Sequence, residues 1–188
     1  MAGLRRRPSG RGAGGFVLVE LMVALVIGAV VLGALTGVLI WYSRVQARTA
    51  AQSAEDQSGA AALDQIAYLI RNAGGTGPAP IASLSSSGLA LQGIPGPQGA
   101  ESDTLSTSAG RLTDVRTVGG TQETLAISQA QGTWSVQFGG LTASGAQVPS
   151  CTAGGSPSCS SVAAVTVTLT LTTGYGARTY GETVDLRN

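Results

Sequence analysis

The chain has 188 residues, of which 43% are hydrophobic and only 11% are charged. It has no histidine, and all of its 11 basic residues are arginine, which excludes histidine general bases and lysine Schiff-base chemistry. With a net charge of +1 and few aromatic residues, it lacks the basic surface and stacking platforms of general nucleic-acid binders. We therefore expect a protein that is not an enzyme and that needs no cofactor or metal.

A polar, glycine-rich and basic segment, residues 1–15, precedes the first apolar run. Without its four arginines the chain keeps 11 − 4 = 7 arginines against 10 acidic residues, a side-chain balance of −3. Arginines beside an apolar span favour the cytoplasmic side of a membrane. The segment is therefore predicted to be a cytoplasmic leader, with the C-terminal part of the chain outside the cytoplasm. Its four arginines are Arg5, Arg6, Arg7 and Arg11.

The next segment, Gly15 to Tyr42, is apolar except for one charged side chain, Glu20. A helix of about 20 apolar residues crosses a bilayer, and Leu21 to Ile40 supplies such a run. A secretory signal peptide would place its small residues after the apolar run, whereas here the glycines precede it. A carboxylate in the membrane costs about 2.5–3.5 kcal/mol, so it indicates a functional site whose natural partner is a free α-amino group.

The sequence GFVLVELMVALVIG places glycine, an aromatic residue and glutamate at fixed offsets before the apolar run, and it resembles the class III signal of type IV prepilins and pseudopilins. The resemblance implies cleavage by a prepilin peptidase between Gly15 and Phe16, followed by N-methylation of Phe16. It also implies that Glu20 holds the family's invariant carboxylate position and pairs with the terminal amine of a neighbouring subunit. Val17 stands where threonine is common. The alternative is an ordinary signal anchor with a chance glutamate.

No proline lies between Pro8 and Pro78, which predicts one long helix from Phe16 to Asn72. Within it, Gly33 and Gly37 form a small-x-x-x-small pair that favours close packing of helices in lipid. The alternative is that these glycines are merely tolerated in an apolar segment.

After Tyr42 the helix pattern becomes amphipathic. Leu63, Ile66, Ala67 and Ile70 follow i, i+3, i+4, i+7 spacing, which predicts packing against a sheet. The segment LDQIAYLIRNAGG resembles the helix end of PilW-type minor pilins and GspJ-type minor pseudopilins. The predicted organisation is leader 1–15, transmembrane and filament-core helix 16–42, amphipathic continuation 43–73 and β-rich head 74–188.

The head is predicted to be a small antiparallel β domain, giving an α+β fold of the type IV pilin kind. Gly74 to Ala100 is expected to be loop with one short strand, Leu89 to Gln92. In Val162 to Thr172, valine or leucine alternates with threonine, which predicts a half-buried strand. The other expected strands are Arg111 to Val118, Thr124 to Ala130, Thr133 to Phe138 and Thr179 to Leu186, the last in a hairpin with Val162 to Thr172.

The two cysteines, Cys151 and Cys159, enclose a short loop, CTAGGSPSC. In an exported domain this spacing predicts a disulfide. The alternatives are free thiols or half of a metal site, although two cysteines without histidine make no familiar zinc set.

Two carboxylate pairs, Glu101 with Asp103 and Glu55 with Asp56, are the remaining candidates for acid–base chemistry. We expect them to lie on a solvated loop or helix surface, because most charged residues do.

These features favour a minor type IV pilin, a low-abundance structural or assembly subunit of a pilus. The implied partners are prepilin peptidase, other pilins, the inner-membrane assembly platform and the cytoplasmic membrane. The implied location is a single-pass inner-membrane protein that moves to the cell surface. The alternatives are a type II secretion minor pseudopilin, a competence or adhesin subunit for DNA uptake or attachment, and, least favoured, a membrane-anchored enzyme.

Overall fold

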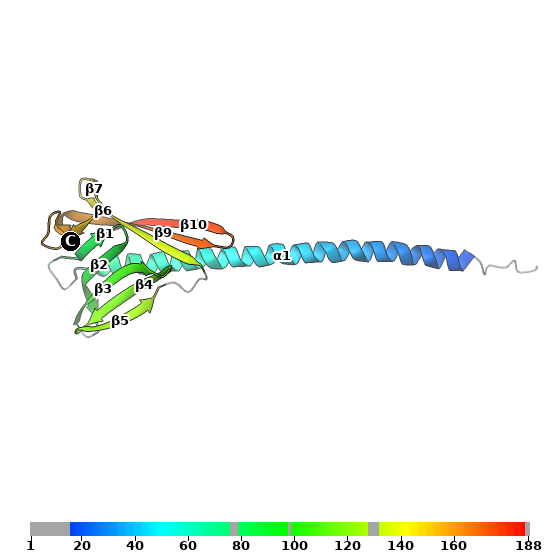
Figure 1. The fold of residues 1–188 in the computed structure, drawn as a ribbon, viewed down its shortest axis with the longest axis horizontal. Coiled ribbons are helices and arrows are strands. Elements are labelled where there is room, and N and C mark those ends of the chain that lie inside the picture. Colours follow the sequence, from blue (N-terminus) through cyan, green and yellow to red (C-terminus); the bar gives the residue numbers. More distant parts are fainter. Residues whose placement is uncertain (1–15, 76–78, 98, 128–131, 187–188) are drawn as a thin grey trace, which may run out of the picture. The chain divides into compact units, whose positions relative to one another are not determined.

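The computed structural model describes residues 16–75, 79–97, 99–127 and 132–186, which form one long helix followed by strands (Figure 1). Helix α1, Phe16–Asn72, has 57 residues. The chain is therefore α+β, as predicted. The other elements are β1 Ile81–Ser85, β2 Gly88–Gly96, β3 Gly99–Ser108, β4 Arg111–Val118, β5 Thr121–Ala126, β6 Thr133–Thr142, β7 Gln147–Val148, β8 Cys151–Thr152, a 3₁₀ turn at Cys159–Ser161, β9 Val162–Thr173 and β10 Gly176–Asp185.

The chain divides into two compact units, residues 1–50 and 51–188, and their boundary lies inside α1. In the first unit, no described side chain from Leu18 to Ala50 is buried. In the second unit the helix acquires a buried face, on which Ile66, Ala67 and Ile70 are at most 2% exposed. The predicted change from a helix that is apolar on all sides to an amphipathic one is confirmed.

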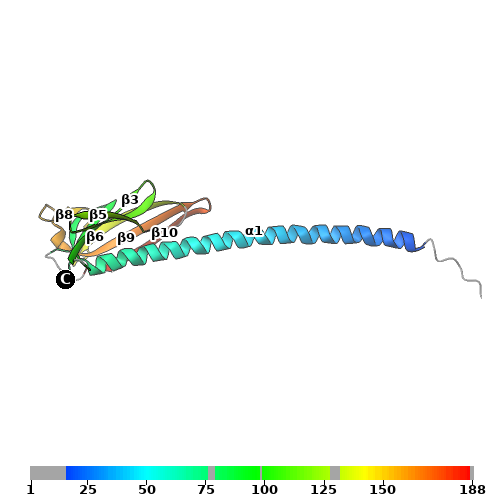
Figure 2. The same ribbon diagram turned by 90° about the horizontal axis from the view of Figure 1, so that it is seen from below.

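The strands form two antiparallel sheets, a six-stranded sheet in the order β5-β4-β3-β2-β1-β8 and a four-stranded sheet in the order β10-β9-β6-β7. Their inner faces and the C-terminal part of α1 share one hydrophobic core (Figure 2). Successive side chains of a strand point to opposite faces, and this decides which of them lie in the core. In β9 the valines and leucines are buried, whereas the threonines between them are only partly buried. The hairpin of β9 and β10, predicted from the sequence, is confirmed by the pairing of Thr173 with Gly176.

The short strand predicted at Leu89 to Gln92 is present within β2, but the prediction of a loop for the rest of Gly74 to Ala100 is wrong, because β1 and all of β2 lie in this range. The glycine- and proline-rich sequence is held in the sheet by pairing on both sides, β2 with β1 and with β3. A bulge between Gln92 and Ile94 takes up Gly93, whose φ is +68°. Pairing supplied by other strands thus overrides weak local β propensity.

The strand boundaries differ at other places too, and β10 begins at Gly176, three residues before the predicted start. β3 was not predicted, and β6 continues past Phe138 to Thr142. β5 begins at Thr121, three residues before the predicted start, because Gly119 and Gly120 form a two-residue turn that pairs Val118 with Thr121. The predicted strand end at residues 128–130 lies outside the described residues.

Strand β10 is tied to α1 by polar contacts within the second unit. Tyr180 Oη donates a hydrogen bond of 3.0 Å to Asp56 Oδ1, and Arg178 Nη1 lies 3.5 Å from the same oxygen. Arg71 Nη2 donates to Glu182 Oε1 at 2.7 Å. Burial, together with the hydrogen bond to Asp56, raises the pKa of Tyr180, so the phenol stays protonated as the donor at neutral pH. Exposed ion pairs contribute about 0–1 kcal/mol each, so they orient β10 more than they stabilise it.

The ring of Tyr180 lies directly against Gly59 of α1, and a Cβ at that position would overlap the ring. We expect Gly59→Ala to destabilise the head by about 1–3 kcal/mol, because the ring and its hydrogen bond to Asp56 must move. The measurement is urea unfolding of the full chain in detergent, followed through the buried Trp134.

The control is the same substitution in a Tyr180→Ala background. There the overlap is gone, and Gly59→Ala is expected to stabilise by up to about 1 kcal/mol through helix propensity. A stabilising effect of Gly59→Ala with Tyr180 present would contradict this account.

Candidate functional site

The predicted assembly site lies at the start of α1. The helix begins at Phe16, and Glu20 lies four residues, about 6 Å, further along its axis. The Glu20 side chain is exposed, and within the described residues no group donates a hydrogen bond to it or forms an ion pair with it. The predicted cleavage residue Gly15 lies outside the described residues. The described part of the chain thus offers this carboxylate no partner.

The helix around Glu20 has the length and composition of a membrane span. Its most apolar 18-residue window has a mean hydropathy of 2.7, and none of that window is buried in the protein. Among the described residues it is the one helix that meets this description. Its exposed large apolar side chains are Leu18, Val19, Leu21, Met22, Val23, Leu25, Val26, Ile27, Val30, Val31, Leu32, Leu35, Val38, Leu39 and Ile40.

The hydroxyl groups of this segment are satisfied by the helix itself. Thr36 Oγ1 donates to the carbonyl of Leu32 at 2.8 Å, and Ser43 Oγ donates to the carbonyl of Ile40 at 2.9 Å. Such bonds remove the cost of placing a hydroxyl in lipid. Glu20 has no equivalent bond to any described residue, in contrast to Thr36 and Ser43.

An aromatic pair, Trp41 and Tyr42, ends the apolar run, and both rings are exposed. Gln46 Nε2 donates to Tyr42 Oη at 2.8 Å, and Arg44 and Arg48 follow on the same helix. Aromatic rings followed by arginines are typical of the membrane–water interface. The apolar run of α1 therefore has an interface-like end about 21 residues after Glu20, close to the length that spans a bilayer.

The glycines of the span have no packing partner among the described residues. A Cβ added at Gly28, Gly33 or Gly37 would meet nothing within 4 Å. Gly33 and Gly37 are four residues apart, one above the other on one helix face. Their predicted role in packing against another helix stays a prediction.

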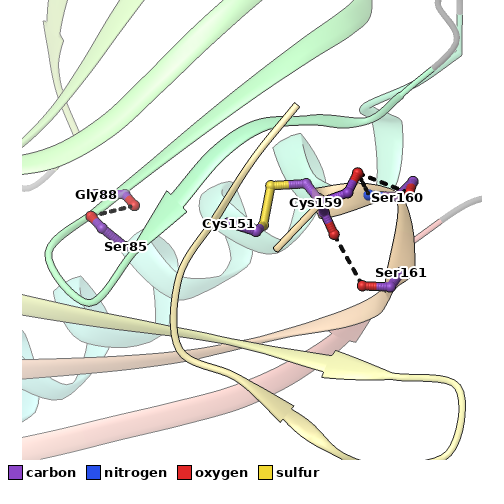
Figure 3. Close-up of a disulfide and its surroundings, with 7 residues drawn as sticks. Ser85, Gly88, Cys151, Cys159, Ser160 and Ser161 are labelled. Carbon is purple, nitrogen blue, oxygen red and sulfur yellow. Dashed lines mark hydrogen bonds between the residues drawn. A yellow bond between two sulfur atoms is a disulfide. The ribbon is translucent and has the colours of Figure 1, made fainter. Parts of the chain in front are cut away.

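The disulfide predicted between Cys151 and Cys159 is present, with Cα atoms 5.1 Å apart and both residues nearly buried (Figure 3). It joins the two sheets. Cys151 lies in β8 and pairs with Leu84 at the edge of the six-stranded sheet, whereas Cys159 lies just before β9 of the four-stranded sheet. Ser158 Oγ accepts from the amide of Ser160 and fixes the short turn between Cys159 and β9.

Replacing both Cys151 and Cys159 with serine should lower the free energy of unfolding by about 2–3 kcal/mol, the chain-entropy value for a loop of this size. Urea unfolding of the full chain in detergent, with and without reductant, measures this loss. The serine variant is the control and should not respond to reductant. Two free thiols in the unreduced wild type would contradict the assignment.

Three of the four acidic residues in the two predicted carboxylate pairs are not where we expected them. The exposed fractions of Glu101, Asp103 and Glu55 are 6%, 0% and 9%, so the prediction of a solvated surface is wrong for all three. The pairs Asp103–Arg116 and Leu105–Asp114 are cross-strand neighbours, so these side chains share the inward face of β3 and β4. The alternating strands carry carboxylates at positions where leucine would be expected.

A buried carboxylate that the sequence reasoning missed, Asp114, is 0% exposed. The signal for it lay in RLTDVRTV, where Asp114 is in phase with the apolar Leu112. Burial, reinforced by the charge of Asp103 and opposed by Arg116, raises the pKa of Asp114 to about 6. Among the described residues no group of three or more histidine, cysteine or acidic side chains is arranged to hold a metal ion.

Comparisons with family models, with curated proteins and with solved structures give no match to this chain.

Proposed function

We propose that the protein is a minor type IV pilin, a subunit that is held in the inner membrane by the first part of α1 and is then built into a filament. The observation that carries this proposal is Glu20, a carboxylate one turn inside an apolar helix that has no partner for it. Its neighbours on the helix, Leu18, Val19, Leu21 and Met22, are exposed and apolar.

The energetics support a partner with a positive charge. A lone carboxylate in lipid is costly, and a close opposite charge in a low dielectric recovers much of that cost. If an adjacent, parallel subunit is offset along the helix axis by about 6 Å, the terminal amine created by its cleavage before Phe16 comes level with Glu20. Pairing between subunits thus makes filament entry favourable for this protein.

The small head fits a structural role. It has a disulfide-linked two-sheet core, and its chain lacks histidine and lysine. The C-terminal part of α1 is packed into this core, so the head is joined directly to the helix that we propose enters the filament.

Glu20→Ala should leave membrane insertion intact and strongly reduce incorporation into filaments, because the subunit can no longer neutralise a neighbouring amine. Membrane fractions and sheared filaments, probed for this protein in its native cells, separate the two steps. Asp64→Ala is the control, since it removes an exposed carboxylate from the same helix. Normal incorporation of Glu20→Ala would contradict the mechanism.

Gly15→Lys should block processing, because the proposed peptidase cuts after Gly15. The precursor would then appear as a larger band, and mass spectrometry of the wild type should find an N-terminus at methylated Phe16. Gly12→Lys adds the same charge to the leader and is expected to be processed normally. A wild-type protein that begins at Met1 in cells would refute the proposal.

A further inference from the structure

The buried acidic cluster of the head has no role in the function proposed above. It lies at one end of the six-stranded sheet, where β3, β4 and the edge strand β5 follow one another. Asp103 of β3 and Asp114 of β4 are diagonal neighbours on the inward face, and both are 0% exposed. Within the described residues, no group donates a hydrogen bond to any of their four carboxylate oxygens.

The charges around these two residues do not balance. Glu101 of β3 adds a third buried carboxylate, and among the described residues Arg116 of β4 is the one cation that forms ion pairs with them. Arg116 Nε lies 3.5 Å from Glu101 Oε2 and 3.4 Å from Asp103 Oδ1, too far for a strong hydrogen bond to either. With all three carboxylates ionised, the cluster carries two uncompensated negative charges.

The neighbouring elements supply no further compensation. From β5, Glu123 is the cross-strand neighbour of Arg116 and adds another negative charge. From β2, Leu91 is paired with Asp103 and is apolar. From β6, which packs against β4, the buried side chains are Trp134, Val136 and Phe138, none of which titrates.

Arg116 is the member of the cluster that reaches solvent. Its side chain is 33% exposed, and with Glu101 and Glu123 it lines an open hollow of about 450 Å³. Protons and water therefore have a route to the edge of the cluster, so its charge state can follow the pH of the medium.

A buried carboxylate without a partner is expensive when ionised, and protonation removes that cost. Burial raises the pKa of Asp103 against the opposing effect of Arg116, and the pKa of Asp114 is raised to about 6. A carboxyl group whose pKa is higher in the folded state stabilises the fold when protonated. That stabilisation is complete below about pH 4 and is lost as the pH rises through 6.

We propose that Asp103 and Asp114 form a proton-operated device that keeps the β3–β4–β5 end of the head closed in acid and loosens it at neutral pH. The device acts locally. Strands β9 and β10 carry no buried carboxylate, and their pairing is insensitive to it.

The test is amide hydrogen exchange of the full chain in detergent at several pH values from 4.5 to 7.5, corrected for the intrinsic effect of pH on exchange. The opening equilibrium of peptides from β3, β4 and β5 is expected to rise by up to about tenfold per pH unit below pH 6 and to level off above it. Peptides from the β9–β10 hairpin are the internal control and should show no such rise.

Asp114→Asn removes the ionisable group with little change in the shape of the side chain. It should abolish most of the pH response of the opening equilibrium, and it should lower that equilibrium at pH 7.5. Glu123→Gln removes an exposed carboxylate from the neighbouring strand and should keep the response. If Asp114→Asn does not fold, the pH dependence of amide exchange in Asp103→Asn and in the wild type still tests the proposal. A β3–β5 opening that is independent of pH in the wild type, or a response lost equally in Glu123→Gln, would overturn the proposal.

Discussion

The burial of one stripe of α1 against two sheets is the contact on which the head depends. Ile66 and Ile70 are fully buried, and each contributes about 1.5–3 kcal/mol of hydrophobic stabilisation. Both sheets need this cover, because their inner faces are lined by leucine and valine. The disulfide between Cys151 and Cys159 adds a covalent link at the point where the chain passes from one sheet to the other.

The first part of the same helix has no such cover. Its apolar side chains are exposed over the whole length from Leu18 to Ile40, and water is a poor solvent for them. In the proposed function, lipid or the apolar helices of other subunits would cover these side chains. One continuous helix thus joins a part with a buried face in the head to a part that is long and apolar enough to span a membrane.

Charge is distributed differently in these two parts. In the apolar part, Glu20 is a single exposed carboxylate with no partner among the described residues. In the head, Asp103 and Asp114 are fully buried, and Arg116 Nε lies 3.4 Å from Asp103 Oδ1. The same chemical group is therefore the basis of the proposed assembly role in one place and of the proposed response to pH in the other.

Much of this protein could be predicted from the sequence. Local patterns were sufficient for α1 from Phe16 to Asn72, for its buried stripe, for the β9–β10 hairpin and for the disulfide, because each depends on spacing between near neighbours. The motif around Glu20 and the apolar run are also sequence features, and their proposed role awaits experiment.

Tertiary structure alone decided the rest. β1, β2 and β3 have sequences rich in glycine, serine and proline, and they are strands because neighbouring strands pair with them. The contact of Tyr180 with Gly59 joins residues more than 100 positions apart, which no local pattern encodes. The burial of Glu101, Asp103 and Asp114 likewise depends on which face of the sheet meets the core, because strand register places alternate side chains on opposite faces.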